Sequence, residues 1–317
     1  MAAKKATARK KSPAKKATVK KVAAKKSQTK AIEAKGFKAK FITGKMPTPG
    51  ALIAEFLGSF ILAGAFIMLF TSGIEGKIGI ALALIAVTII FGVLSRSHFN
   101  PAITIALWAN RRVSGMKTIL YIIAQGLGAM LAWFILMTIF NTSFEGTIVA
   151  NLLAQGVSQS MIDDAGGLLE FAKANGFDTL NDLAARIGIA PFVDIDISKT
   201  GLITFFSELM GAIIFGLAAG YAFIKDNKPA VKAIVLGFGL FAGLLIGGAN
   251  VVLNPAVAGA LGAFFHAWNS AELIMWPLIT YIVATIAGIT IGVTAFRFLL
   301  KDAGSDEDDV IETKKKK

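Results

Sequence analysis

The chain has 317 residues, of which 55% are hydrophobic, with a mean hydropathy of +0.66 and no cysteine. This composition excludes an ordinary soluble domain, disulfides and thiolate metal sites, and it favours a polytopic membrane protein. The net charge of +13 suggests a nucleic-acid binder until it is located. Residues 1–45 hold fifteen lysines and one arginine against Glu33 alone, so the basicity belongs to one end of the chain.

Residues 1–45 run in Ala-Lys-Lys steps with almost no large apolar side chains. Such a segment cannot form a core, and we expect a disordered cytoplasmic tail whose positive charge fixes the topology. Its composition also resembles lysine-rich histone tails, so contact with anionic lipid or nucleic acid is the alternative interpretation. Because blocks of like charge are usually only solvated, we prefer the first interpretation.

Six apolar stretches are long enough to cross a hydrocarbon core of roughly 30 Å as helices. They are residues 50–70, 78–94, 115–140, 202–224, 230–248 and 274–300, with a short turn over 72–77 between the first two. Lysine and arginine flank the loops before the third and fifth stretches, which predicts that these loops and both termini are cytoplasmic in the cell membrane. Residues 301–317 are predicted to be a charged, disordered tail.

The largest segment outside the spans, residues 141–200, holds eight acidic residues against three basic ones. It lies three crossings away from the basic tail, so we expect it to be extracytoplasmic. Short amphipathic helices are predicted near 167–174 and 179–187. A loop of this length is more often ordered or functional than idle.

An Asn-Pro-Ala motif occurs twice, as Asn100-Pro101-Ala102 and as Asn254-Pro255-Ala256. Asn is a favoured N-cap, and Pro at the first helical position lacks only an N–H that would have been unpaired. The apolar pieces that follow, 101–110 and 255–265, would each be roughly 15 Å long, half of the hydrocarbon core. The motifs therefore predict two half-helices.

The two motifs belong to a repeat. Glu55 precedes Asn100 by 45 residues, and Glu208 precedes Asn254 by 46. Each half crosses the membrane three times, so the second half is inverted and the half-helices meet N-terminus to N-terminus. Two helix ends of roughly +0.5 charge each repel cations, while a neutral solute accepts hydrogen bonds from the two asparagine amides. The inference is a pore for small neutral molecules.

The paired motifs resemble those of the aquaporin or major intrinsic protein family. The resemblance also includes Glu55 and its counterpart Glu208, His98, and the stretch Tyr121 to Gln125 with Gly128-Ala129. It implies an all-α membrane protein of six transmembrane helices plus two re-entrant half-helices, a pore in each subunit and a homotetramer. The expected domains are a tail at 1–45, a first repeat at 46–140, an insertion at 141–200, a second repeat at 201–300 and a tail at 301–317.

The resemblance also places a selectivity filter, and here the chain departs from the family. An arginine commonly follows the second motif, but this chain has Val257. The filter position of the fifth span is Ala242 or Gly243, and that of the second span is Ile80 or Leu84. A small, apolar filter predicts that water passes and that glycerol, urea or ammonia passes too, with one barrier to cations removed.

Several interpretations stay open. Glu55 and Glu208 either carry protons or, as we prefer, accept hydrogen bonds from the re-entrant backbone. His98 is either a pH gate or a loop residue of the cytoplasmic vestibule. The alternatives to a passive channel are a secondary transporter and a membrane tether that uses the basic tail. No nucleophile, phosphate loop or metal cluster is recognisable, so we expect no enzyme, cofactor or metal.

Overall fold

The computed structural model describes residues 46–189, 197, 200–224, 227–264 and 271–315. Within these ranges the regular elements are helices. In chain order they are α2 (Pro49–Leu69), α3 (Gly73–Ser95), α4 (Pro101–Ala109), α5 (Gly115–Ala154), α6 (Gln159–Asp164), α7 (Leu168–Ala174), α8 (Leu180–Arg186), α9 (Leu202–Ala222), α10 (Pro229–Gly247), α11 (Pro255–Ala260), α12 (Ala271–Leu278), the π-helical turn η1 (Ile279–Ala284) and α13 (Thr285–Lys315).

Six of these helical stretches are long and apolar enough to cross a membrane: α2, α3, α5, α9, α10 and Met275–Asp302. Their outer surfaces carry large apolar side chains, among them Ile203 at 85%, Val93 at 73% and Phe134 at 63% exposure. A surface of this kind is stable in the hydrocarbon of a bilayer and not in water. The chain is therefore a multi-pass membrane protein.

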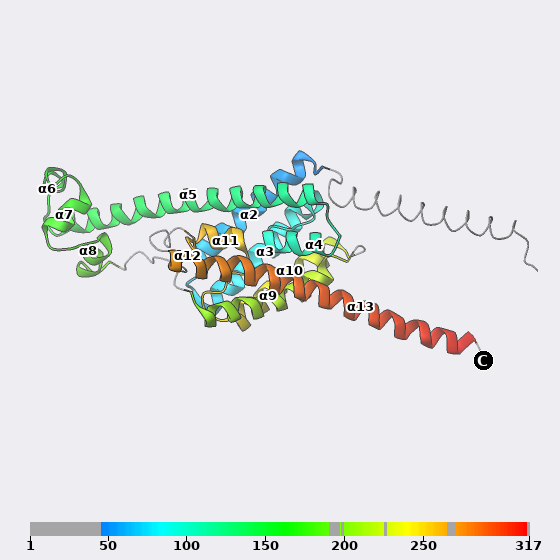
Figure 1. The fold of residues 1–317 in the computed structure, drawn as a ribbon. Coiled ribbons are helices and arrows are strands. Elements are labelled where there is room, and N and C mark those ends of the chain that lie inside the picture. Colours follow the sequence, from blue (N-terminus) through cyan, green and yellow to red (C-terminus); the bar gives the residue numbers. More distant parts are fainter. Residues whose placement is uncertain (1–45, 190–196, 198–199, 225–226, 265–270, 316–317) are drawn as a thin grey trace, which may run out of the picture.

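The two halves of the bundle interlock through their short helices (Figure 1). The first half consists of α2 to α5, and the second of α9 to α13. Helix α4 packs against α5 and also against α13, while α11 packs against α2 and α5 of the first half. Each half-helix therefore lies between its own half and the opposite one.

The helices begin where the sequence supplies caps. Thr48 accepts a hydrogen bond from the backbone N–H of Ala51 at the start of α2, and Ser114 accepts one from Lys117 at the start of α5. Proline follows the cap residue of α2, α4, α10 and α11. These local signals explain why most predicted boundaries lie within two residues of the observed ones.

Helix α5 is longer than predicted. The third span was expected to end at residue 140, but α5 continues to Ala154, across the predicted boundary of the insertion. The hydroxyls of Thr138, Thr142 and Thr147 each donate to the carbonyl four residues earlier, so these polar side chains are satisfied within the helix. No proline interrupts residues 141–154, and nothing in the local sequence ends the helix there.

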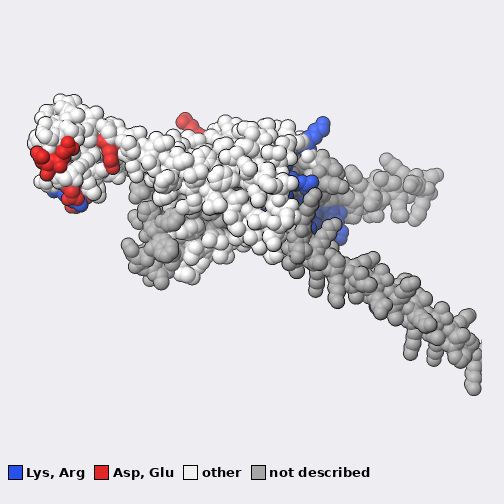
Figure 2. Space-filling view, turned by 90° about the horizontal axis from the view of Figure 1, so that it is seen from above, with Lys and Arg blue, Asp and Glu red and all other residues white. Residues whose placement is uncertain are grey.

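The end of α5 and the three short helices after it form a small core of their own. Ile148 and Leu152 of α5 are buried against side chains of α6, α7 and α8, with Phe171 and Leu183 among them. Helices α7 and α8 match the predicted short helices, whereas α6 was not predicted. In Figure 2 acidic side chains predominate at this end of the molecule, with a few basic ones among them, and other lysine and arginine side chains lie toward the opposite end.

Three other expectations differ from the structure. The predicted turn over 72–77 is mostly helix, because α3 already begins at Gly73. The second half-helix ends at Ala260 and is followed by turns, so it is shorter than predicted. The backbone of α13 is helical to Lys315 and runs through most of the segment predicted to be a disordered tail. The prediction for residues 1–45 lies outside the described residues.

The last span contains a π-helical turn whose tyrosine binds the neighbouring re-entrant loop. Pro277 lies inside α12 and is followed directly by η1. Proline removes a backbone donor and disturbs the i to i−4 ladder, which accounts for the wider π-helical turn. Tyr281 in this turn donates its hydroxyl to the carbonyl of Asn250, at 2.9 Å. In the first half, Tyr121 donates in the same way to the carbonyl of Ser95, at 2.8 Å.

Candidate functional site

The two asparagines of the repeated motif are brought together between the halves. Asn100 caps α4 by accepting from the N–H of Ala102 at 2.8 Å, and Asn254 caps α11 by accepting from the N–H of Ala256 at 3.1 Å. The capping oxygen is therefore occupied by its own helix. The orientation of each amide nitrogen follows from this.

Each amide nitrogen reaches across to the other half. Nδ2 of Asn100 donates to the carbonyl of Leu253 at 2.7 Å, and Nδ2 of Asn254 donates to the carbonyl of Phe99 at 2.9 Å. Both asparagines are at most 3% exposed. This reciprocal pair of hydrogen bonds holds the two helix N-termini close together inside the bundle. Each N-terminus carries a partial positive charge.

Two buried glutamates hold the backbone that precedes the asparagines. Glu55 accepts hydrogen bonds from the N–H groups of His98 at 2.9 Å and Phe99 at 2.7 Å. Nε2 of Gln125 donates to the same carboxylate at 2.8 Å. A buried carboxylate needs such donors, and irregular backbone at membrane depth needs such acceptors.

The second half repeats the arrangement. Glu208 accepts from the N–H groups of Val252 at 2.9 Å and Leu253 at 2.8 Å, and from the hydroxyl of Thr285 at 2.6 Å. Phe99 and Leu253, the residues before the two asparagines, have positive φ angles of 46° and 60°. Such angles are unfavourable for residues with a β-carbon, and the glutamates hold the backbone in them.

A narrow cavity of about 10 Å³ lies at the asparagine pair. This is close to the smallest volume that holds one water molecule. Phe99, Asn100 and Asn254 bring the polar groups of the loops to an otherwise largely apolar wall. The remaining lining residues are Leu62, Phe66, Leu84, His98, Ile103, Phe215 and Leu240.

The residues predicted for the filter lie in different places. Leu84 lines the narrow cavity beside the asparagines, so it is level with the motif. Ile80, one turn earlier in α3, is buried at 2% exposure, and Val257 is buried at 1%. Ala242 is partly exposed. Gly243 faces α9 instead, because a β-carbon there would lie 2.7 Å from the carbonyl oxygen of Gly211.

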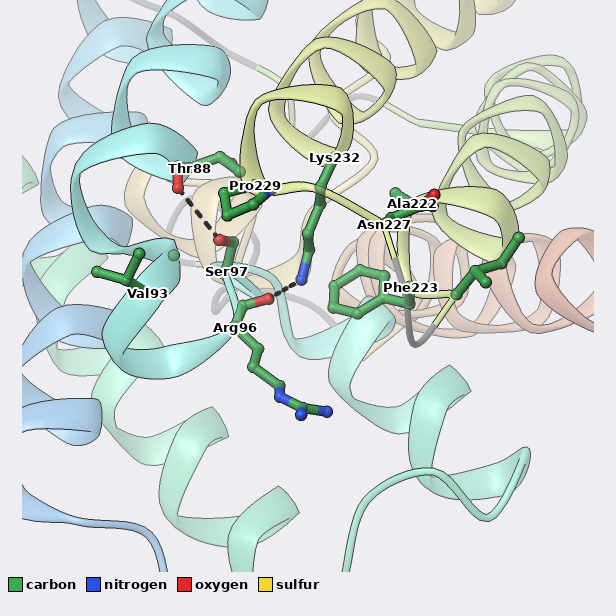
Figure 3. Close-up of a pocket in the computed structure, with 11 residues that line it drawn as sticks. Thr88, Val93, Arg96, Ser97, Ala222, Phe223, Asn227, Pro229 and Lys232 are labelled. Atoms are coloured by element: carbon green, nitrogen blue, oxygen red, sulfur yellow. Dashed lines mark hydrogen bonds between the residues drawn. The ribbon is translucent and has the colours of Figure 1, made fainter.

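A second, larger cavity of about 230 Å³ lies where α3 ends and α10 begins (Figure 3). Lys232 of α10 donates from Nζ to the carbonyl of Arg96, and its ammonium lies 3.8 Å from the centroid of the Phe223 ring. Ser97 donates to the carbonyl of Thr88 at 3.5 Å. The other lining residues are Gly92, Val93, Ala222, Ile224, Asn227 and Pro229.

His98 lies in the loop between α3 and α4, outside the six spans, and is buried at 2% exposure. Its Nδ1 is 3.1 Å from the hydroxyl of Thr104, and its ring meets those of Tyr121 and Phe223 edge to face. Burial, together with the nearby charges of Lys117, Lys232 and Arg96, holds the pKa of His98 well below its ordinary value. The imidazole is therefore neutral, which favours the role of a vestibule residue over that of a pH gate.

Sequence reasoning missed the lysines beside the re-entrant loops and the tyrosine pair Tyr121 and Tyr281. In the sequence, Tyr121 was recognised only as part of a motif, and the basic residues beside the loop before the fifth span only as a signal of topology. Tyr121 follows Asn100 by 21 residues and Tyr281 follows Asn254 by 27, so each half has a tyrosine in the span after its half-helix. In the part of the chain that the structure describes, no three His, Asp or Glu side chains come together as metal ligands.

This geometry defines a class of protein, a membrane channel built from an inverted repeat with two half-helices that meet at paired asparagines. The sequence matches the family described as "Major intrinsic protein" over residues 43–164. It is 29% identical to the glycerol uptake facilitator protein of Haemophilus influenzae over 254 residues, which cover 68% of this chain and 90% of that protein. It is 38% identical to aquaporin Z of Photorhabdus laumondii over 108 residues, 30% of this chain and 47% of that one.

Among solved structures, the fold is similar to that of the aquaglyceroporin from Plasmodium falciparum, with 19% identity, a TM-score of 0.45, and coverage of 78% of this chain and 93% of that one. The family model and these relatives support the major intrinsic protein family for this chain. It is a membrane channel for water or small solutes, and it is not an enzyme.

Proposed function

We propose that this channel conducts water and also small neutral solutes such as glycerol, urea or ammonia, through a filter that lacks the usual arginine. The observation that carries the proposal is the asparagine pair, whose amides bond across the halves beside a cavity of about 10 Å³. A solute in this cavity meets two positive helix ends. Neutral hydrogen-bonding molecules are tolerated there, whereas cations are repelled.

The width of the filter is the second part of the proposal. We assign it to Ile80, Ala242 and Val257, and we drop Leu84 because of its place beside Asn100 and Gly243 because of its contact with α9. The three assigned side chains offer neither charge nor hydrogen bonds. Such a filter distinguishes solutes by size. It does not impose the fixed hydrogen-bond geometry that an arginine imposes on a passing water molecule.

The alternative of a secondary transporter needs a group that binds a coupling ion. The two acids buried in the spans, Glu55 and Glu208, each accept three hydrogen bonds from the protein. Acids occupied in this way support a structural role. The relatives named as a glycerol facilitator and an aquaporin also favour a passive channel.

The proposal also covers the assembly of the chain, its orientation in the membrane and its domains. The chain forms a homotetramer in the cell membrane with both termini in the cytoplasm and the insertion at 141–200 outside. The repeats occupy 46–140 and 201–300, and the tails 1–45 and 301–317. The charges support the orientation, because acidic side chains outnumber basic ones on α6 to α8, and basic side chains predominate at the opposite end (Figure 2).

The test is stopped-flow light scattering on proteoliposomes under water, glycerol and urea gradients, with the native chain beside Val257→Arg. The arginine should lower the ratio of glycerol to water permeability at least about tenfold, the effect of roughly 1.4 kcal/mol on a barrier. Because Val257 is buried, Ala242→His at the partly exposed filter position serves as a second variant and should lower the same ratio. An unchanged ratio in both folded variants contradicts this account of the filter.

A further inference from the structure

Two lysines bind the re-entrant loops in the same way, one in each half. Lys77 is the fifth residue of α3, and its Nζ donates to the carbonyl of Gly248 at 3.0 Å. Lys232 is the fourth residue of α10, and its Nζ donates to the carbonyl of Arg96 (Figure 3). Helices α3 and α10 are the second helices of their halves. Each lysine thus crosses to the loop that precedes the asparagine of the opposite half.

Both lysines continue the helix faces that line the narrow cavity. Lys77 is seven residues before Leu84, and Lys232 is eight residues before Leu240. Leu84 and Leu240 both line the cavity at the asparagines. Residues seven or eight apart share one face of a helix. At 1.5 Å per residue, the lysines begin about 10 to 12 Å from the level of the asparagines.

Lys77 and Lys232 lie on opposite sides of the asparagine pair because the two halves are inverted. Lys232 lines the cavity of about 230 Å³ at one mouth, together with Ser97 and Asn227. Lys77 lies at the other mouth, beside the loop that leads to Asn254. Both side chains are held by a backbone carbonyl.

We propose that the amino groups of Lys77 and Lys232 form a symmetric pair, one on each side of the asparagines, whose positive charge disfavours cations in the conduction path. This inference rests on the proposed function and deepens it, because it concerns the specificity of the same pore. The charge that a filter arginine supplies is absent at Val257. The two lysines place amino groups on either side of the asparagine pair, and positive charge at these places opposes a passing cation.

The experiment measures two quantities on the full chain in proteoliposomes. Water permeability is followed by light scattering, and proton and sodium entry by enclosed fluorescent indicators under an imposed potential. The variants are Lys77→Gln, Lys232→Gln and the double change, since glutamine keeps an N–H donor for the carbonyl but loses the charge. Lys77→Arg and Lys232→Arg keep the charge. Lys228→Met, an exposed residue just before α10, is the matched control.

We expect the double glutamine variant to raise proton or sodium flux at least tenfold, with water permeability within twofold of the native value. The arginine variants and Lys228→Met should match the native chain in both readouts. An unchanged ion flux in a water-conducting double variant overturns the role of the lysines and leaves the proposed function standing. Loss of water permeability in folded glutamine variants also overturns it, because the lysines would then be structural. A native chain that conducts neither water nor glycerol overturns both proposals.

Discussion

Gly211 and Gly243 face each other where α9 crosses α10, and each lies against the other's backbone. A β-carbon on Gly211 would be 2.6 Å from the carbonyl oxygen of Gly243, and one on Gly243 would be 2.7 Å from that of Gly211. Contacts this short are not seen for real β-carbons. The absence of side chains at these two positions allows the close approach of the helices, as small residues do in membrane bundles.

The first prediction concerns this crossing. Gly243→Ala should lower the free energy of unfolding by about 1 to 3 kcal/mol, because the added methyl group forces two backbones apart. The measurement is thermal unfolding in detergent. Gly126→Ala is the control, since a β-carbon on Gly126 meets nothing within 4 Å. If both variants unfold at the native temperature, the contact does not have the assigned role.

The second prediction concerns the buried acids. Glu55→Gln replaces one carboxylate oxygen by an amide N–H donor. The backbone N–H of either His98 or Phe99 then loses its acceptor and faces another donor. A lost hydrogen bond to a charged group is worth about 1.5 to 3 kcal/mol, so thermal stability and water permeability should both fall. Glu208→Gln should behave alike.

The control for this pair is Glu75→Gln, an exposed acid in the first turn of α3, which should leave both readouts unchanged. Proton-coupled uptake that disappears in Glu55→Gln while stability stays native would favour the transporter alternative. Solute uptake is therefore measured with and without a pH gradient in the same vesicles.

The third prediction concerns pH. Burial and the surrounding cations Lys117, Lys232 and Arg96 lower the pKa of His98, so its imidazole remains neutral as the pH falls below the ordinary histidine value. Water permeability should therefore be flat between about pH 5.5 and 8, a range that spans the ordinary histidine pKa near 6.5. Stopped-flow measurements across this range check it. A step in permeability near pH 6.5 that is absent in His98→Asn would show that His98 does gate.

The fourth prediction concerns the basic segment at 1–45. Its deletion should leave water and glycerol permeability unchanged, because the asparagine site and both cavities are built from later residues. If the segment binds anionic lipid or nucleic acid, deletion should also abolish retention on anionic vesicles or DNA that salt weakens. Absence of such retention in the full chain would end the tether alternative.

The sequence itself determined the half-helices and the repeat, because these depend on local chemistry. An N-cap asparagine followed by proline starts a helix wherever it stands, and hydropathy alone marks a span. The pairing of Glu55 with one loop and Glu208 with the other was also predictable. Equal spacing in two halves that cross the membrane three times leaves an inverted arrangement as the consistent one.

Only the tertiary structure decided how the neighbours of these residues pack. Counting along α10 left Ala242 and Gly243 equivalent, and the contact of Gly243 with Gly211 separates them. The reach of Lys77 to Gly248 spans 171 residues of sequence, and it depends on a helix that begins at Gly73 where a turn was predicted. Such pairings follow from how two helices pack, and packing depends on side chains far apart in the chain.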